Sequence, residues 1–167
     1  GMVKEFSVAE NMILREHDQP PYSANGFLKL KGIAEHTNQL IDQYNVKTPS
    51  QKTLAKSLSG GNIQKIVLAR ELSRNPRTII AAQPTRGLDI GAAEYVREQL
   101  LIQRKNDTAV LLISEDLDEI LALSDRIAVI YEGRIIAVLE RDEATKDEIG
   151  LLMAGVDTKK GQAEPSK

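Results

Sequence analysis

The segment TIIAAQPTRGLDIGAAEYVREQLLIQRKNDTAVLLI, residues 78–113, decides the fold class of this chain. It contains two short apolar runs, 78–82 and 108–113, and neither of them alternates apolar with polar residues. Such runs are typical of strands that are buried on both faces. Between them, from about 91 to 104, apolar residues recur at the spacing of a helix. Two buried strands bridged by a helix predict a parallel sheet and an α/β fold.

The residues before this segment predict helices. A capping box at 7–10, Ser first and Glu three residues later, opens a short helix that runs to about Leu14. A loop with two prolines and a glycine follows at 19–26. Apolar residues at spacings of three and four then predict an amphipathic helix over 30–44. A further helix is expected over 59–74, where Asn and Pro end it.

The residues after the segment predict a short helix near 117–121, a hairpin and a final helix. Glu132 and Gly133 lie between two apolar runs, which is a strong hairpin signal. A second capping box at 145–148 opens the last helix, and Gly155 is expected to end it.

Composition excludes several classes of site. The chain has 167 residues and a formal net charge of −2, with no cysteine and two histidines. Disulfides, cysteine-ligated metals and a histidine-rich metal site are therefore excluded. The near-neutral charge argues against a protein that coats nucleic acid. No apolar run approaches the ~20 residues that cross a bilayer, so a soluble, cytosolic protein is expected.

The sharpest chemical pattern is Leu-Ser-Gly-Gly-Asn-Ile-Gln-Lys at 58–65. It places a serine and two glycines at the start of a helix, where backbone N–H groups are unpaired and carry partial positive charge. Two glycines let an anion approach the backbone closely, and the Ser59 hydroxyl can add a hydrogen bond. The alternative is that Ser59 is only the N-cap of a loop-to-helix junction.

In its wider context this pattern resembles the signature motif of the ATP-binding domains of ABC transporters. Residues 79–85 lie where that family has its Walker B strand, and 86–89 resemble its D-loop, with Gly87, Leu88 and Asp89. Residues 112–116 lie where the family has its switch-histidine loop. The resemblance covers roughly residues 3 to 153.

Finer details resemble the subfamily that imports simple sugars and nucleosides, in which two ATP-binding halves are fused in one chain. The Asn in the signature and the Pro-Thr-Arg-Gly-Leu-Asp run both fit that subfamily. The run Ala81-Ala82-Gln83-Pro84 looks most like the second half of its nucleoside-type members. Their substrate-binding protein is a basic membrane lipoprotein.

The sequence departs from the family at its chemical positions. No glycine is followed by lysine, so a P-loop is missing and the chain is expected to be a fragment of a longer protein. Ala82 and Gln83 stand where the family has the Asp and Glu of Walker B. Alanine offers no ligand, and glutamine is no proton acceptor. Glu115 stands at the switch histidine, and its charge would repel a phosphate.

The resemblance implies a helical subdomain at 3–76, a partial RecA-like α/β subdomain at 77–155 and a flexible tail at 156–167. It implies that the signature residues Ser59, Gly60, Gly61 and Gln64 bind ATP held by the other half, and that the positions Ala82, Gln83 and Glu115 are degenerate.

The resemblance also implies the surroundings. ATP and Mg²⁺ would act in the full-length assembly, with neither expected on the isolated fragment, and no metal site is expected on this chain. The expected partners are the first ATP-binding half, transmembrane permease subunits and, indirectly, the lipoprotein, with no nucleic acid. The location would be the cytoplasmic face of a prokaryotic plasma membrane.

Two other functions stay open. One is a soluble ABC-type protein of translation or DNA repair, but such proteins need basic surfaces or long coiled coils, and neither is visible here. The other is a helical interaction module in which Ser59 serves only as a cap.

Overall fold

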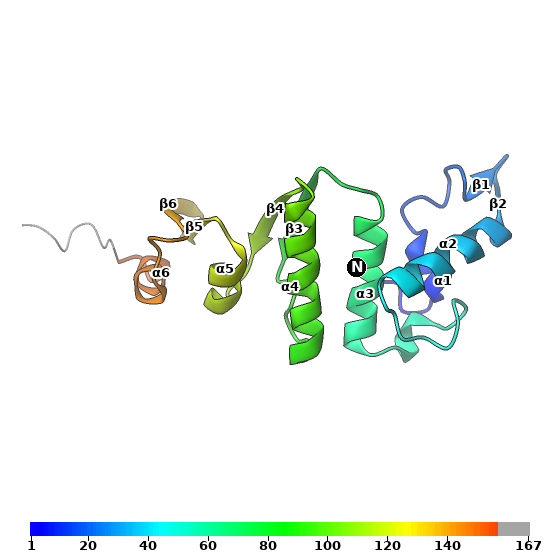
Figure 1. The fold of residues 1–167 in the computed structure, drawn as a ribbon, viewed down its shortest axis with the longest axis horizontal. Coiled ribbons are helices and arrows are strands. Elements are labelled where there is room, and N and C mark those ends of the chain that lie inside the picture. Colours follow the sequence, from blue (N-terminus) through cyan, green and yellow to red (C-terminus); the bar gives the residue numbers. More distant parts are fainter. Residues whose placement is uncertain (157–167) are drawn as a thin grey trace, which may run out of the picture. The chain divides into compact units, whose positions relative to one another are not determined.

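The computed structural model describes residues 1–156, which divide into two compact units (Figure 1). The first unit comprises residues 1–79 and 84–111, and the second comprises 80–83 and the residues from 112 onward. Each unit is a set of residues that contact one another more than they contact the other unit. The predicted domain limits at 3–76 and 77–155 stay a prediction, and the predicted tail, apart from Val156, lies outside the described residues.

Helices dominate the first unit, as the sequence predicts. Its elements are α1 (Val8–Met12), β1 (Ser23–Ala24), β2 (Phe27–Leu28), α2 (Leu30–Gln43), the 3-10 helix η1 (Ala55–Ser57), α3 (Gly60–Leu72) and α4 (Ile90–Lys105). The capping box of α1 is confirmed, since Glu10 N donates to Ser7 Oγ at 3.2 Å and Ser7 N donates to Glu10 Oε2 at 2.7 Å. These bonds to Ser7 lower the pKa of Glu10.

The prediction of a plain loop at 19–26 is corrected by the structure. Ser23 and Ala24 pair antiparallel with Phe27 and Leu28. The turn between them uses Asn25 and Gly26, which have φ angles of 51° and 80°. Asn-Gly is a preferred hairpin turn, but strands of two residues leave no alternation for a sequence pattern to reveal.

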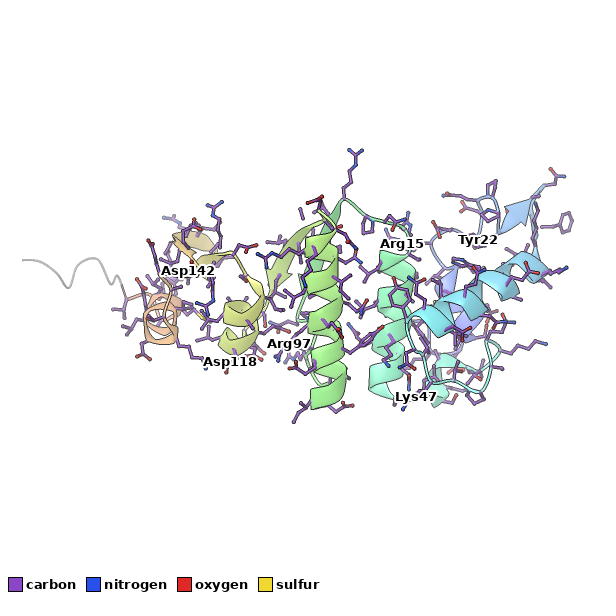
Figure 2. The ribbon with its side chains drawn as sticks, in the orientation of Figure 1. Arg15, Tyr22, Lys47, Arg97, Asp118 and Asp142 are labelled. Carbon is purple, nitrogen blue, oxygen red and sulfur yellow. The ribbon has the colours of Figure 1, made fainter. Side chains whose placement is uncertain are left out.

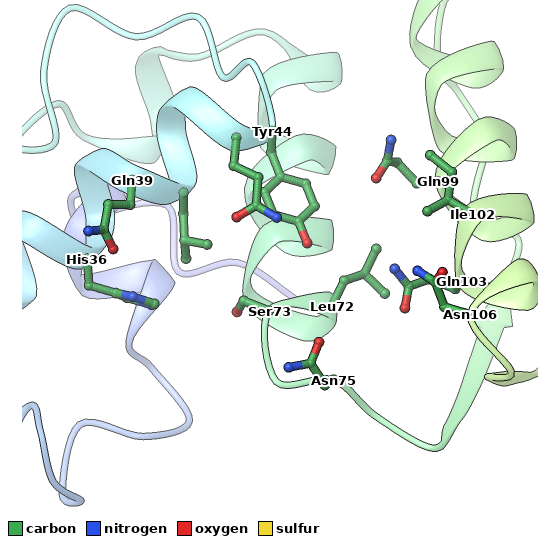
Figure 3. Close-up of a pocket in the computed structure, with 12 residues that line it drawn as sticks. His36, Gln39, Tyr44, Leu72, Ser73, Asn75, Gln99, Ile102, Gln103 and Asn106 are labelled. Atoms are coloured by element: carbon green, nitrogen blue, oxygen red, sulfur yellow. The ribbon is translucent and has the colours of Figure 1, made fainter.

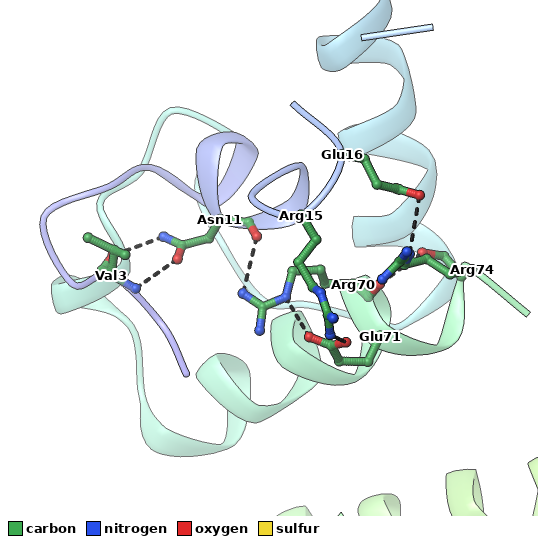
Figure 4. Close-up of polar contacts among 8 residues, drawn as sticks. Val3, Asn11, Arg15, Glu16, Arg70, Glu71 and Arg74 are labelled. Atoms are coloured by element: carbon green, nitrogen blue, oxygen red, sulfur yellow. Dashed lines mark hydrogen bonds and ion pairs between the residues drawn. The ribbon is translucent and has the colours of Figure 1, made fainter. Parts of the chain in front are cut away.

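Helix α3 forms the centre of the first unit. Ile66 and Ala69 are fully buried, and Leu72 is almost so. The helix contacts α1, α2 and α4. The buried side chain of Asn11 joins α1 to the chain before it, because its Oδ1 accepts from Val3 N at 2.9 Å and its Nδ2 donates to Val3 O at 3.0 Å (Figure 4).

Ion pairs link the end of α3 to the segment after α1 (Figure 4). Glu71 accepts from Arg70 Nε at 2.9 Å and from Arg15 Nη1 at 2.8 Å, and Arg74 pairs with Glu16 at 3.3 Å. Burial alone would raise the pKa of Glu71, but the two guanidinium groups outweigh burial and lower it. The carboxylate therefore stays charged beside the buried Arg70.

The two predicted strands pair as β3 (Thr78–Ala82) and β4 (Ala109–Ile113). Ala109 N donates to Arg77 O at 3.1 Å and Gln83 N donates to Ile113 O at 2.7 Å, so both strands run in the same direction. The parallel α/β arrangement is confirmed. The prediction that these strands are buried on both faces is wrong, because every second residue is exposed, with Ile80 at 68%.

The second unit holds the predicted hairpin and two helices. Its further elements are α5 (Leu117–Leu123), β5 (Arg126–Tyr131), β6 (Arg134–Glu140) and α6 (Lys146–Met153). Strands β5 and β6 are antiparallel, and α6 covers their inner face. Lys146 at the start of α6 pairs with Asp118 of α5, whose side chain is labelled in Figure 2. Gly155 ends α6 as predicted, with a φ angle of +79°. Within residues 1–156, no helix combines the length and apolar character that a membrane span requires.

Replacing Asn11 by Ala should lower the free energy of unfolding by about 2–3 kcal/mol, because the N–H and C=O groups of Val3 would lose their buried partner. Urea unfolding measures the loss. Asn38→Ala, on the exposed side of α2, is the matched control and should cost less than about 0.5 kcal/mol. Equal losses for the two variants would contradict this role of Asn11.

Candidate functional site

Ser59 lies at the N-cap of α3 with its backbone extended, at φ −67° and ψ 157°. Its side chain is exposed, and Ser59 Oγ accepts from Asn62 N at 3.4 Å. No heavy atom lies within 4 Å of the position that a Cβ at Gly60 would occupy. The first turn of α3 itself contains no acidic residue, and the carboxylate that approaches it, that of Asp89, comes from the start of α4. This helix start has the exposure and polarity that an anion requires.

Asn62, which the sequence indicated only as a feature of the subfamily, contacts Ser59 in the structure. Its Nδ2 donates to Ser59 Oγ at 3.0 Å, and its Oδ1 accepts from the backbone N–H of Lys47 at 2.7 Å. The amide thus links the helix start to the segment that follows α2. Nothing in the sequence pattern pairs Asn62 with Lys47, because fifteen residues separate them.

Gly61 brings the signature segment against the predicted D-loop. A Cβ at Gly61 would lie 3.1 Å from Ala92 Cβ and 3.9 Å from Asp89 Oδ2. Asp89 caps α4, since its Oδ1 accepts from Ala92 N at 2.9 Å. Asp89 is therefore the N-cap of α4, and the close approach of α3 to the start of α4 favours a residue without a side chain at 61.

Gln64 adds a polar link from the signature segment to the end of the run 79–85, just before the predicted D-loop. Its Nε2 donates to Pro84 O at 3.2 Å, and the loop that follows turns back with Leu88 N donating to Thr85 O at 3.1 Å. Gly87 in this turn has a φ angle of +73°, which favours glycine. The structure thus places the Gln64 amide against the backbone just before the predicted D-loop.

Lys65 and Tyr95 hold the two residues that follow α2 against α3 and α4, which the sequence did not indicate. Lys65 Nζ donates to Asn45 O at 2.9 Å and lies 4.6 Å from the centre of the Tyr95 ring. The Tyr95 hydroxyl donates to Tyr44 O at 3.0 Å. Burial, with smaller contributions from Tyr44 and Glu98, raises the pKa of Tyr95 to about 12. The phenol therefore stays a neutral donor at physiological pH.

A cavity of about 430 Å³ lies within the first unit, where residues of α2, α4 and the end of α3 face one another (Figure 3). Side-chain amides such as Gln43, Gln99 and Gln103 line it, together with the buried Tyr44 and Leu72. None of the residues singled out from the sequence lines this cavity.

In the second unit, Ala82 is the last residue of β3, Gln83 follows it, and Glu115 lies two residues after the end of β4. Gln83 has a φ angle of 48°, and its N–H is bonded to Ile113 at the end of β4. The residues after the two strands therefore lie at the same edge of the pair, as parallel pairing requires. Ala82 and Glu115 are exposed.

These residue types limit the chemistry at that edge. Ala82 has no ligand atom, Gln83 has no proton-accepting carboxylate, and Glu115 has no proton to donate while ionised. No group of three or more His, Asp or Glu side chains in residues 1–156 could hold a metal ion. At the end of β3, Ala82 and Gln83 therefore offer no carboxylate to a Mg²⁺ ion.

The contact of Gly61 with Ala92 is open to a direct test. Gly61→Ala should lower the free energy of unfolding by about 1 kcal/mol or more relative to Gly60→Ala, because Ala92 Cβ moves only with the backbone of α4. Gly60→Ala meets open space and gains helix propensity, so it should leave stability unchanged or raise it. Thermal or urea unfolding compares the two, and an equal stability of the variants would contradict the close approach.

Comparison with curated proteins gives close relatives. The chain is 52% identical over 155 residues to the guanosine import ATP-binding protein NupO of Bacillus subtilis. It is 47% identical over 155 residues to the nucleoside import ATP-binding protein NupA of Lactococcus lactis. It is also 41% identical over 157 residues to the glucose import ATP-binding protein TsgD13 of Haloferax volcanii. Each match covers 93% of this chain but only 28–31% of the relative, so the chain spans less than a third of these relatives. No protein-family model matches it.

Solved structures give the fold. MJ0796, described as a bacterial ABC transporter cassette in its dimeric structure, matches with a TM-score of 0.67 and 19% identity, over 84% of this chain and 59% of that one. MJ1267, an ATP-binding cassette of an ABC transporter in its ADP conformation, matches with a TM-score of 0.63 and 23% identity, over 93% of this chain and 61% of that one. The predicted fold class, a helical subdomain with part of a RecA-like sheet, is confirmed. In sequence the chain is similar to part of several import ATP-binding proteins, and in fold it is similar to the ATP-binding cassettes of ABC transporters.

Proposed function

We propose that this chain is the C-terminal part of the second nucleotide-binding domain of an ABC importer and supplies the signature motif to an ATP site in trans. The observation that carries the proposal is the exposed start of α3, where Ser59 is the N-cap. The N–H groups of Gly60 and Gly61 lie in the first helical turn and have no acceptor within the helix. Together with the hydroxyl, they present donors to a phosphate.

The phosphate itself would be held by a P-loop on the other half. In phosphoryl transfer, positioned donors stabilise the charge on the transferred group, and little covalent chemistry falls to the protein. Ser59 and the two glycines suit this role because they donate hydrogen bonds and leave room for the ligand. The names of the relatives, import ATP-binding proteins, support ATP as the ligand.

We further propose that the site built on this half is degenerate. Ala82 removes the carboxylate that would support Mg²⁺ through water, and Gln83 replaces the group that would polarise the attacking water. Glu115 would place a negative charge near the phosphate. The resulting pair of sites is asymmetric, with this chain assisting hydrolysis at the partner's P-loop.

The rest of the assembly follows from the same proposal. Exposed apolar side chains of β2 and of the start of α2, namely Phe27 (78% exposed), Leu28 and Leu30 (72%), offer a surface for a permease subunit. The subunit would act at the cytoplasmic face of a bacterial or archaeal plasma membrane, with a solute-binding lipoprotein taking part indirectly. Nucleosides are the favoured solute, because the two relatives with the higher identity import them.

In the full-length transporter, Ser59→Arg should reduce ATP turnover on the order of 10²-fold or more, because a bulky side chain would displace the phosphate from the helix start. Gln83→Ala should change turnover far less, since glutamine is already no base. Gln83→Glu should not restore a second full-strength site, because Ala82 and Glu115 remain.

Steady-state ATPase activity of the reconstituted transporter measures each variant. Abolished turnover in Gln83→Ala together with intact turnover in Ser59→Arg would reverse the assignment of the two sites.

The chain of 167 residues alone should bind Mg·ATP weakly or not at all and should not hydrolyse it, because it contains no Gly-Lys pair to form a P-loop. Isothermal calorimetry checks this, with a P-loop-containing half of the same transporter as the positive control. Micromolar affinity for ATP in the chain by itself would contradict the proposal.

A further inference from the structure

The orientation of the Asn62 amide is determined by its neighbours. Lys47 N can only donate a hydrogen bond, and it lies 2.7 Å from Asn62 Oδ1. The oxygen of the amide must therefore face Lys47, and the –NH₂ group must face Ser59. A flipped amide would bring two donors together at the Lys47 end.

This orientation fixes what the Ser59 hydroxyl can do. A hydroxyl has one proton to donate and two lone pairs to accept with. Ser59 Oγ already accepts from Asn62 Nδ2 at 3.0 Å and from Asn62 N at 3.4 Å. Both lone pairs are thereby directed into the protein, and within residues 1–156 no acceptor takes the proton of this exposed hydroxyl. The O–H points outward as a donor.

We propose that Asn62 is a positioning residue that fixes the Ser59 hydroxyl as an outward hydrogen-bond donor for the phosphate bound in trans. The proposal rests on the function proposed above and assigns to Asn62 a role that none of the earlier arguments requires. Ser59 contacts the ligand, and Asn62 acts only through Ser59.

The acceptor side of Asn62 is itself held in place. The chain just before Lys47 is anchored by Lys65 Nζ, which donates to Asn45 O at 2.9 Å, and by the Tyr95 hydroxyl, which donates to Tyr44 O. Val46, which lies between Asn45 and Lys47 in the chain, is buried. Because these contacts fix the Lys47 N–H, the amide does not rotate freely, and the serine is oriented before the ligand arrives.

Asn62→Asp separates positioning from stability. A carboxylate still accepts from Lys47 N, and an acidic group in the first turn favours the helix, so the fold should be kept or stabilised. The carboxylate has no proton to give to Ser59, so the hydroxyl would turn inward and donate to it. Asn62→Ala instead leaves the hydroxyl free to rotate and removes the bond to Lys47.

The test is the ATPase activity of the full-length transporter, with kcat and KM for ATP measured separately, in wild type, Asn62→Ala, Asn62→Asp, Ser59→Ala and Ser59→Ala/Asn62→Asp. Asn62→Asp should reduce kcat/KM on the order of 10- to 100-fold. It should be more damaging than Asn62→Ala, although urea unfolding should find Asn62→Asp at least as stable. In the Ser59→Ala background, Asn62→Asp should reduce kcat/KM less than threefold, because the residue that it acts through is gone.

Three results would overturn the inference. The first is Asn62→Asp activity equal to wild type. The second is Asn62→Ala being the more damaging variant, which a structural role would produce. The third is a full additional loss in the Ser59→Ala background, which would indicate a direct effect of charge. If Ser59→Arg leaves turnover intact, the proposed function fails first; if Ser59→Arg abolishes turnover but any of the three results is found, only the role of Asn62 fails.

Discussion

The packing of helix α3 is the constraint on which the candidate site depends. Its apolar residues face three other helices of the first unit, and Ile66 and Ala69 have no exposed surface. A close-packed interior resists small displacements, since even one methylene is felt. The first turn of α3 is therefore held by burial one to two turns further along, while Ser59 itself stays exposed. Rigidity and accessibility are supplied by different parts of one helix.

Polar contacts complete what packing alone leaves undetermined. Hydrophobic burial fixes the axis of α3, but it does not orient a hydroxyl or an amide. Gln64 ties the helix to Pro84, and Asn62 ties Ser59 to Lys47. Each of these side chains is only half-buried. Their net contribution to folding is modest, about 1 kcal/mol per hydrogen bond, so their value lies in orientation more than in stability.

At the strand ends of the second unit, the backbone conformation is fixed by hydrogen bonds and does not depend on which side chains are present. Gln83 keeps a left-handed φ angle, and its N–H stays bonded to Ile113. That conformation costs roughly 1–2 kcal/mol in a residue other than glycine, so the surrounding contacts must enforce it. The backbone at this edge is therefore well defined by its hydrogen bonds. Ala82, however, has no polar side-chain group that could bind a ligand or a metal ion.

The sequence by itself determined the helices, the caps and the hairpin, because these depend on neighbours in the chain. Ser7 caps α1 by bonding to Glu10 three residues away, and Glu132 and Gly133 turn the hairpin with positive φ angles. The position of Ser59 at a helix start followed from the same local rules. Tertiary structure alone decided which strand faces are covered and which side chains support Ser59. Ile80 is exposed because burial depends on what packs against a face, and Asn62 meets Lys47 because the fold brings two segments together. Periodicity and capping arise from local backbone geometry, whereas burial and the orientation of an amide depend on the positions of residues distant in the sequence.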